Sequence, residues 1–182
     1  MTYDLFEHRH RFSAWAAARA AQRGLRNGTT EVCYHALKNE AKLTEFIRQH
    51  AGKPITCKEF DKLHREWCKS VVAYLKEQGV SAVTYGRAAK LVGVYLKCMV
   101  VIGPLAGTPL ARFAHPPIDS NILDGLAEVP GISPKAKKIF LSTRWTKLDR
   151  KQYYDLVKII RSEKELRDDI DPFWRLERYW LP

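Results

Sequence analysis

The stretch that most constrains the fold is the apolar run "GRAAKLVGVYLKCMVVI", residues 86–102. No other segment of the chain is as apolar, so we expect a helix over about 85–102 in the centre of the molecule. Residues spaced by four, three and four along a helix share one face. Four residues of this helix have that spacing: Gly86, Lys90, Gly93 and Lys97.

Segments with apolar residues at intervals of three and four, separated by glycine and proline, predict further helices. No alternating strand pattern or internal repeat accompanies them. The sequence therefore predicts an all-α fold, a compact single-domain bundle of about seven to eight helices over residues 1–182. The expected ranges are 4–23, 29–50, 56–79, 119–127, 134–142, 149–162 and 171–180, in addition to the central helix.

Helix starts are marked by capping residues. Thr56 and Glu59 form a capping-box pattern, while Ser133 and Asp149 are placed to cap the helices that follow them. Between the central helix and residue 118 lies a Gly/Pro-rich loop, "GPLAGTPLARFAHPP". Loops of this length without structure of their own are often functional.

The charge is the strongest compositional signal, because a formal charge of +11 favours polyphosphate partners, nucleic acid first and anionic membrane second. A solvated basic surface is the simpler alternative. No run of about 18 apolar residues is present, and the N-terminal residues lack a signal-peptide pattern. We expect a cytoplasmic protein without a membrane-spanning segment.

The four cysteines are scattered without a CxxC pair, which argues against a zinc site and favours buried free thiols. His64 and Cys68 are the only close His/Cys pair at helical spacing. We expect no metal, no cofactor and a monomer.

Lys90 is a charged residue within an apolar helix, and two explanations are open. Its aliphatic stem could lie on the core while the ammonium reaches water. Alternatively, a desolvated amine could act as a nucleophile toward an electrophilic carbon. In "HPPIDSNIL", residues 115–123, Asp119 is placed to cap a helix, where backbone N–H groups and the helix dipole stabilise an anion by about 0.3–1 kcal/mol. The two prolines before it restrict the direction of the carboxylate.

A lysine helix, a Gly/Pro-rich loop and an aspartate opening a helix occur here in the order found in the helix-hairpin-helix, Gly/Pro-rich loop, Asp superfamily of DNA glycosylases. "AAKLVGVYLK" followed by "HPPIDSNIL" most resembles its archaeal 8-oxoguanine glycosylase branch, over about residues 84–128. The resemblance implies that Lys90 is the Schiff-base lysine and Asp119 the catalytic aspartate. Several pieces across nearly the whole chain, among them "HRFSAWAAARAA" and "FWRLERYW", also resemble a widespread set of bacterial proteins of unknown function.

In those glycosylases the DNA-gripping hairpin precedes the lysine, whereas here its counterpart, "EVPGISPKAKKI", follows Asp119. Backbone N–H groups at the helix start could hold a phosphate, or the segment could be an ordinary helix-helix turn. The candidate nucleic-acid contacts are Gly131, Ser133, Lys135, Lys137, Lys138 and the aromatic Trp145. The candidate pocket residues are His115, Lys97, Trp15 and His10.

Three functions remain open. The first is a DNA glycosylase and AP lyase that excises a modified or damaged base, such as 8-oxoguanine, flipped from double-stranded DNA. The second is a non-catalytic helical module that binds nucleic acid. The third is a helical interaction protein with no nucleic-acid role.

Overall fold

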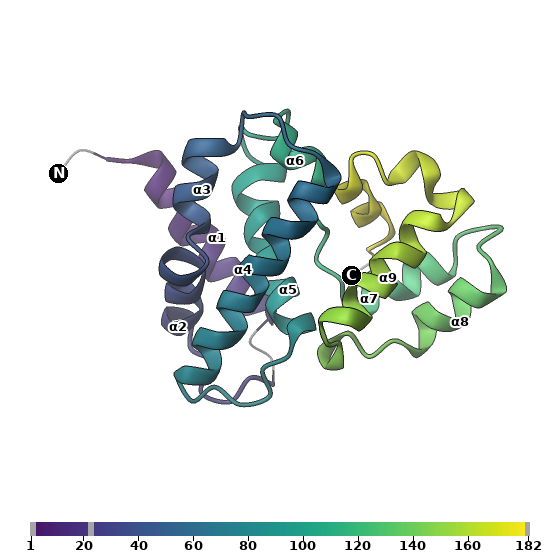
Figure 1. Cartoon of the computed structure of the whole chain (residues 1–182), viewed down its shortest axis with the longest axis horizontal. Coiled ribbons are helices and arrows are strands. Elements are labelled where there is room, and N and C mark those ends of the chain that lie inside the picture. Colours follow the sequence, from purple (N-terminus) through teal and green to yellow (C-terminus); the bar gives the residue numbers. More distant parts are fainter. Residues whose placement is uncertain (1–2, 22–23, 181–182) are drawn as a thin grey trace.

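The computed structural model describes residues 3–21 and 24–180, and within them the chain forms helices and no strand (Figure 1). The all-α fold class predicted from the sequence is thereby confirmed. The α-helices are α1 (Leu5–Ala21), α2 (Thr30–His35), α3 (Leu43–His50), α4 (Cys57–Glu77), α5 (Tyr85–Leu96), α6 (Pro109–Phe113), α7 (Ser120–Ala127), α8 (Pro134–Ser142) and α9 (Arg150–Ser162). The remaining helical segments are π-helical turns at Ala36–Glu40 and Lys97–Val101, and 3-10 helices at Trp145–Lys147, Lys164–Asp169 and Phe173–Tyr179.

The helix expected over 29–50 is divided in two. Lys42 adopts a left-handed backbone conformation with φ 49°, which separates the π-helical turn after α2 from α3. The division lets Leu43 and Ile47 of α3 face the core. No glycine or proline marks this break, so local sequence rules do not find it.

One further expectation is corrected, because α6 forms inside the segment expected to be a loop, with Thr108 as its cap and Pro109 at its first position. The helix expected over 171–180 is present as a 3-10 helix over Phe173–Tyr179. The described residues therefore hold nine α-helices instead of seven or eight. Residues 22 and 23, expected at the end of the first helix, lie outside the described ranges.

The predicted caps are confirmed. The Thr56 hydroxyl accepts from the Glu59 N–H while the Glu59 carboxylate accepts from the Thr56 N–H, which completes a capping box. Asp149 forms a second box at the start of α9, and Ser133 caps α8. Each cap satisfies N–H groups that a helix cannot bond internally.

α5 is the central helix, as its apolar sequence predicts. It packs against α1 and α4 on one side and against the Trp145–Lys147 turn and α9 on the other. Nine of its twelve residues are buried. A single cluster of buried side chains runs from Ala14 of α1 to Leu176 near the C-terminus. The single-domain organisation stays a prediction.

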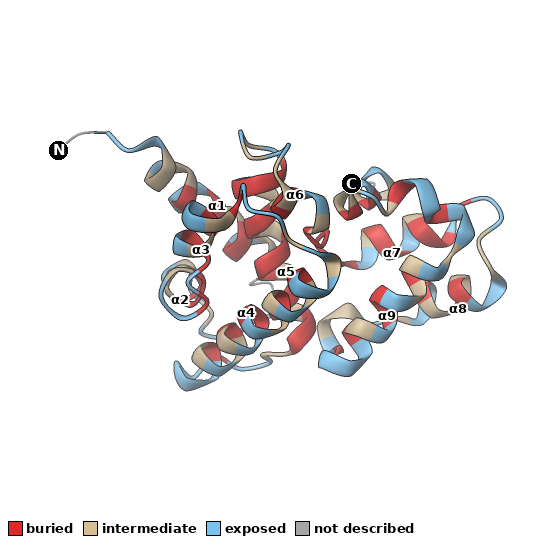
Figure 2. Cartoon of the chain, turned by 45° about the horizontal axis from the view of Figure 1, so that its top comes forward, coloured by how far each residue is buried: buried red, intermediate tan, exposed pale blue. Residues whose placement is uncertain are grey.

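The helices fall into two groups in both views, with α1 to α6 on one side and α7 to α9 with the C-terminal 3-10 helices on the other (Figures 1 and 2). The buried "HPP" segment links them and leads into α7. Pro117 of this segment packs over Gly93 of α5. The second group therefore packs on the face that carries Gly86, Lys90 and Gly93 of α5 and Lys97 of the π-helical turn that continues it.

Two glycines permit backbone contacts that a side chain would block. A Cβ atom on Gly86 would lie 2.0 Å from the Trp145 carbonyl oxygen, and one on Gly125 would lie 1.9 Å from the Tyr179 carbonyl oxygen. The Gly86 N–H also donates to the Leu148 carbonyl at 3.0 Å. These contacts bring the 145–148 turn onto α5 and the C-terminal segment onto α7.

Gly86→Ala is expected to destabilise the fold by about 1–3 kcal/mol, because the added methyl group overpacks a rigid backbone contact. Chemical denaturation monitored by circular dichroism measures the change. Gly107→Ala is the matched control, since a Cβ there meets nothing within 4 Å. Equal stability of the two variants would contradict the close packing of the turn on α5.

Candidate functional site

Lys90 and Asp119 meet where the two groups of helices join. The Lys90 Nζ donates to Asp119 Oδ2 at 2.9 Å, and each of the two side chains keeps 12% of its surface exposed. Asp119 Oδ1 accepts from the Ile122 N–H at 3.2 Å, so the residue caps α7 and pairs with the lysine at once. The cap and the ion pair use different oxygens of one carboxylate.

The "HPP" segment is anchored by its histidine. His115 is buried, with its Nε2 2.9 Å from Asp61 of α4 and its Nδ1 3.1 Å from the Tyr153 hydroxyl of α9. Arg161 of α9 donates to both oxygens of Asp61, at 2.8 and 3.1 Å. Burial lowers the pKa of His115, while hydrogen bonds from His115 and Arg161 hold the pKa of Asp61 well below its usual range against the effect of burial. This network fixes the direction from which the chain enters α7.

Two tryptophans border the ion pair. The Lys90 Nζ lies 4.6 Å from the centre of the Trp145 ring, within the range of a cation–π contact. The Trp180 indole N–H donates to Asp119 Oδ2 at 3.2 Å. Trp145 reaches this position because Gly86 admits the 145–148 turn, and Trp180 because Gly125 admits the C-terminal segment.

A second ion pair joins Lys97 of the π-helical turn to Glu177 of the C-terminal 3-10 helix. Burial raises the pKa of the Glu177 carboxyl, while the Lys97 ammonium acts in the opposite direction. Asp119 and Lys90 are close enough to act on the same carboxyl electrostatically. Glu177 and Trp180 were not expected at the site. The sequence feature that could have indicated them is the single carboxylate among aromatic and basic residues in "FWRLERYW".

The expected pocket residues do not form one pocket. His115 is buried in the anchoring network, and its polar contacts do not include Lys90 or Asp119. Trp15 is 51% exposed on α1, where it lines a separate surface cavity with Arg11 and Phe12. Of the four expected pocket residues, Lys97 is the one near the Lys90–Asp119 ion pair, because its partner Glu177 is close to both residues of that pair.

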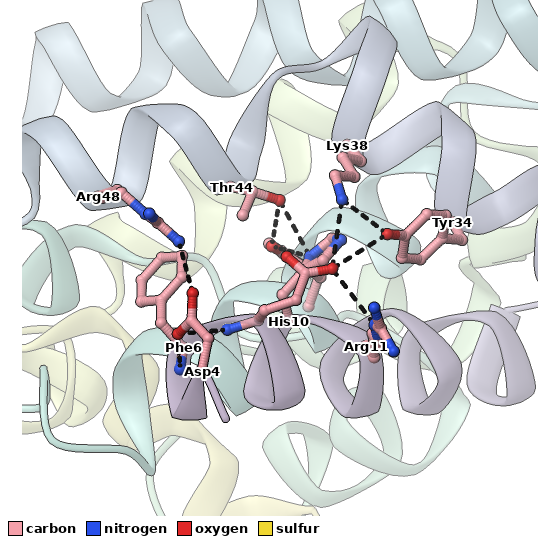
Figure 3. A network of polar contacts seen from close by, with 10 residues as sticks. Asp4, Phe6, His10, Arg11, Tyr34, Lys38, Thr44 and Arg48 are labelled. Carbon is pink, nitrogen blue, oxygen red and sulfur yellow. Dashed lines mark hydrogen bonds and ion pairs between the residues drawn. The ribbon is translucent and has the colours of Figure 1, made fainter. Parts of the chain in front are cut away.

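His10 belongs to a polar network between α1, α3 and α5 (Figure 3). Its Nδ1 lies 2.8 Å from the Tyr95 hydroxyl and 3.0 Å from the Thr44 hydroxyl. Beside it, Glu7 accepts from Lys38 at 3.3 Å. A histidine near the start of a helix can face a pocket or the core, and here the interhelical packing places it in the core.

The "VPGIS" turn is surrounded by carboxylates of the same chain. The Ser133 N–H and hydroxyl donate to Glu163 at 3.1 and 2.9 Å, and the Glu165 side chain lies against Gly131. Lys137 pairs with Glu128 at 3.1 Å. Lys135 and Lys138 are exposed. A phosphate would reach the Ser133 donors only by displacing Glu163, and nucleic-acid contact at this turn stays a prediction.

Family models, curated proteins and solved structures were each compared with the chain, and none of them matches it. Within residues 3–21 and 24–180, no three His, Cys, Asp or Glu side chains gather in a way that could hold a metal ion. In the same ranges, no helix has the length and apolar character needed to cross a membrane.

Folding stability is expected to fall as the pH falls from about 6.5 to about 4. Burial lowers the pKa of His10 from 6.5 to about 4, so in this window the unfolded chain binds a proton that the folded protein does not. The loss amounts to about 1.4 kcal/mol per pH unit for this group, and the lowered pKa values of His64 and His115 act in the same direction.

Denaturation curves at about pH 7 and about pH 4.5 are expected to differ less for His10→Gln than for the unmodified chain, since one linked proton is removed. His8→Gln is the control for losing a histidine from the same helix, because His8 is exposed. If the pH dependence of stability is unchanged in His10→Gln, His10 binds protons equally in the folded and unfolded states, which contradicts the prediction.

Proposed function

We propose that the chain is a DNA glycosylase with AP lyase activity, which excises a modified or damaged base through Lys90 and Asp119. The observation that carries the proposal is the 2.9 Å contact between these side chains, 29 residues apart in sequence, at the junction of the two groups of helices. Each of the two side chains keeps 12% of its surface exposed, so the pair is not fully enclosed.

The chemistry proceeds at C1′ of the flipped nucleotide. The bond from C1′ to the base breaks with its electron pair going to the base, and Asp119 stabilises the positive charge that develops on the sugar. The Lys90 amine forms a bond to C1′, and its ammonium proton passes by way of Asp119 to the departing base. The C1′–O4′ bond then breaks with its electron pair going to O4′, which takes a proton from the attached Lys90 nitrogen, and a Schiff base remains. Transfer of a C2′ proton to water breaks the bond from C3′ to the phosphate oxygen, so the 3′ phosphate leaves with the electron pair and the strand is cut.

The surroundings of the pair suit a nucleic-acid substrate. An enzyme that acts on a base in duplex DNA must flip it and stack it against aromatic or apolar side chains. Trp145 and Trp180 both contact the pair and come from different segments. The formal charge of +11 supplies attraction to phosphates, which is sequence-independent and strong at low salt.

Borohydride is expected to trap a covalent complex between the chain and duplex DNA that carries 8-oxoguanine or an abasic site, visible as a band shift on a denaturing gel. Lys90→Gln should lower trapping about 100-fold or more, because it removes the nucleophile. Asp119→Asn should also lower trapping, because the anion that stabilises the sugar cation is lost.

Two variants separate chemistry from structure. Lys90→Arg keeps a cation beside Asp119 but supplies no amine that can form a Schiff base, so it should bind DNA and remain folded without being trapped. Lys38→Gln removes a half-buried lysine that is also paired with a carboxylate, at 3.3 Å from Glu7, and should be trapped like the unmodified chain. Trapping that persists in Lys90→Arg would contradict the proposal.

The alternative is a module that binds nucleic acid without chemistry, in which Lys90 and Asp119 only tie the two groups of helices together. The mutual pairing of the two charges favours this alternative, because a buried pair can be wholly structural. Under it, the unmodified chain binds DNA and gives no trapped complex with any damaged duplex.

A further inference from the structure

A basic groove lies between the two groups of helices, apart from the "VPGIS" turn. It is a cavity of about 520 Å³ between the C-terminal half of α4, the start of α5 and the segment that leads into α9. Its lining includes the apolar side chains of Val72, Val83 and Leu148. Four cations stand around it: Lys69, Lys76, Lys147 and Arg150.

Positive charge predominates in the lining of this groove. All four cations are exposed, and no ion pair joins any of them to a carboxylate in the ranges that the structure describes. The one acidic residue that lines the groove is Asp149, whose carboxylate caps α9 by accepting from the Gln152 N–H at 2.8 Å. The groove therefore attracts anions more strongly than a surface of alternating charge.

The spacing of the cations suits a chain of phosphates rather than a single anion. Lys69 and Lys76 are seven residues apart on α4, which places them about 10 Å apart along one face. Lys147 and Arg150 belong to the opposite wall, where Lys147 ends the 3-10 turn before α9 and Arg150 is the first residue of α9. A phosphodiester strand lying between the walls would meet cations on both sides.

The groove is connected to the Lys90–Asp119 pair through the start of α5 and the 145–148 turn, although neither Lys90 nor Asp119 lines it. Thr84, which lines it and caps α5, donates its hydroxyl to the Thr146 carbonyl at 2.9 Å. Thr146 follows Trp145, whose ring lies against Lys90. Lys90 is six positions after Thr84, which corresponds to about 9 Å along α5. A nucleotide at Lys90 would thus have its neighbouring phosphates within reach of the groove.

The "VPGIS" turn offers a weaker phosphate site. Its Ser133 donors are bonded to Glu163, Glu165 lies against Gly131 and Lys137 is paired with Glu128. The electrostatic attraction of the turn is reduced by these three acids, whereas the groove has one acid against four cations.

We infer that the groove formed by Lys69, Lys76, Lys147 and Arg150 binds the phosphodiester backbone of DNA beside the Lys90–Asp119 pair. The inference deepens the proposed function, because it rests on DNA as the substrate of that site. It assigns the main contact with the DNA phosphates to the groove instead of the "VPGIS" turn.

Two charge-reversed double variants with the same net charge test the assignment. Lys69→Glu with Lys147→Glu alters the groove, and Lys135→Glu with Lys138→Glu alters the helix after the turn. Fluorescence anisotropy with an undamaged duplex measures Kd over a range of salt concentrations. The groove variant is expected to raise Kd about tenfold or more and to lower the slope of log Kd against log salt by about two.

The turn variant should change Kd less than about threefold, since only the general field is altered. Equal losses in the two variants would overturn the assignment, and so would tighter binding of the unmodified chain to phosphatidylserine-containing vesicles than to the duplex. Thermal melting of both variants checks that each is folded. If either groove substitution unfolds the chain, Lys69→Gln with Lys147→Gln replaces it, with a proportionally smaller expected shift.

This measurement is independent of the chemistry at Lys90. Absence of borohydride trapping by the unmodified chain would contradict the glycosylase proposal and leave the binding result unaffected. Conversely, equal Kd values for the groove and turn variants, together with Lys90-dependent trapping, would contradict only the assignment of DNA binding to the groove. The glycosylase proposal would stand.

Discussion

The ion pair between Lys90 and Asp119 is the interaction on which the arrangement of the two groups of helices depends. Each charge is largely removed from water, and an isolated charge in such a place would cost several kcal/mol. Each buried charge therefore needs the opposite charge and further hydrogen bonds to be stable. Asp119 accepts these further hydrogen bonds from the Ile122 N–H and the Trp180 indole N–H. The position of α7 relative to α5 is therefore coupled to the same contact that is proposed to carry the chemistry.

Contacts elsewhere in the structure place further side chains beside the Lys90–Asp119 ion pair. Gly86 admits the turn that carries Trp145, and Gly125 admits the segment that carries Trp180. His115, held by Asp61 and Arg161, fixes the buried chain that leads into α7. Because this support consists of backbone contacts and buried hydrogen bonds, the site is preorganised. The basic groove carries the positive charge that the proposed nucleic-acid substrate requires.

Local signals in the sequence predicted much of this, and long-range contacts account for what they missed. The caps at Thr56, Ser133, Asp119 and Asp149 were predictable because a cap bonds within its own first turn. The spacing of Gly86, Lys90, Gly93 and Lys97 predicted one special face of α5, and the structure brings Lys90 and Asp119 together there. The break at Lys42 was missed because it depends on how Leu43 and Ile47 pack. Trp180 and Glu177 meet partners 61 and 80 residues away, and Ser133 meets Glu163 30 residues away, which no local pattern encodes.

The identity of the lysine that becomes attached to DNA tests the central claim most directly. After borohydride reduction with a damaged duplex, nuclease treatment and proteolysis, mass spectrometry locates the residual sugar adduct on the chain. The account predicts the adduct on Lys90, the lysine beside Asp119 and Trp145. An adduct spread over exposed lysines such as Lys135 and Lys147, with Lys90 unmodified, would contradict it.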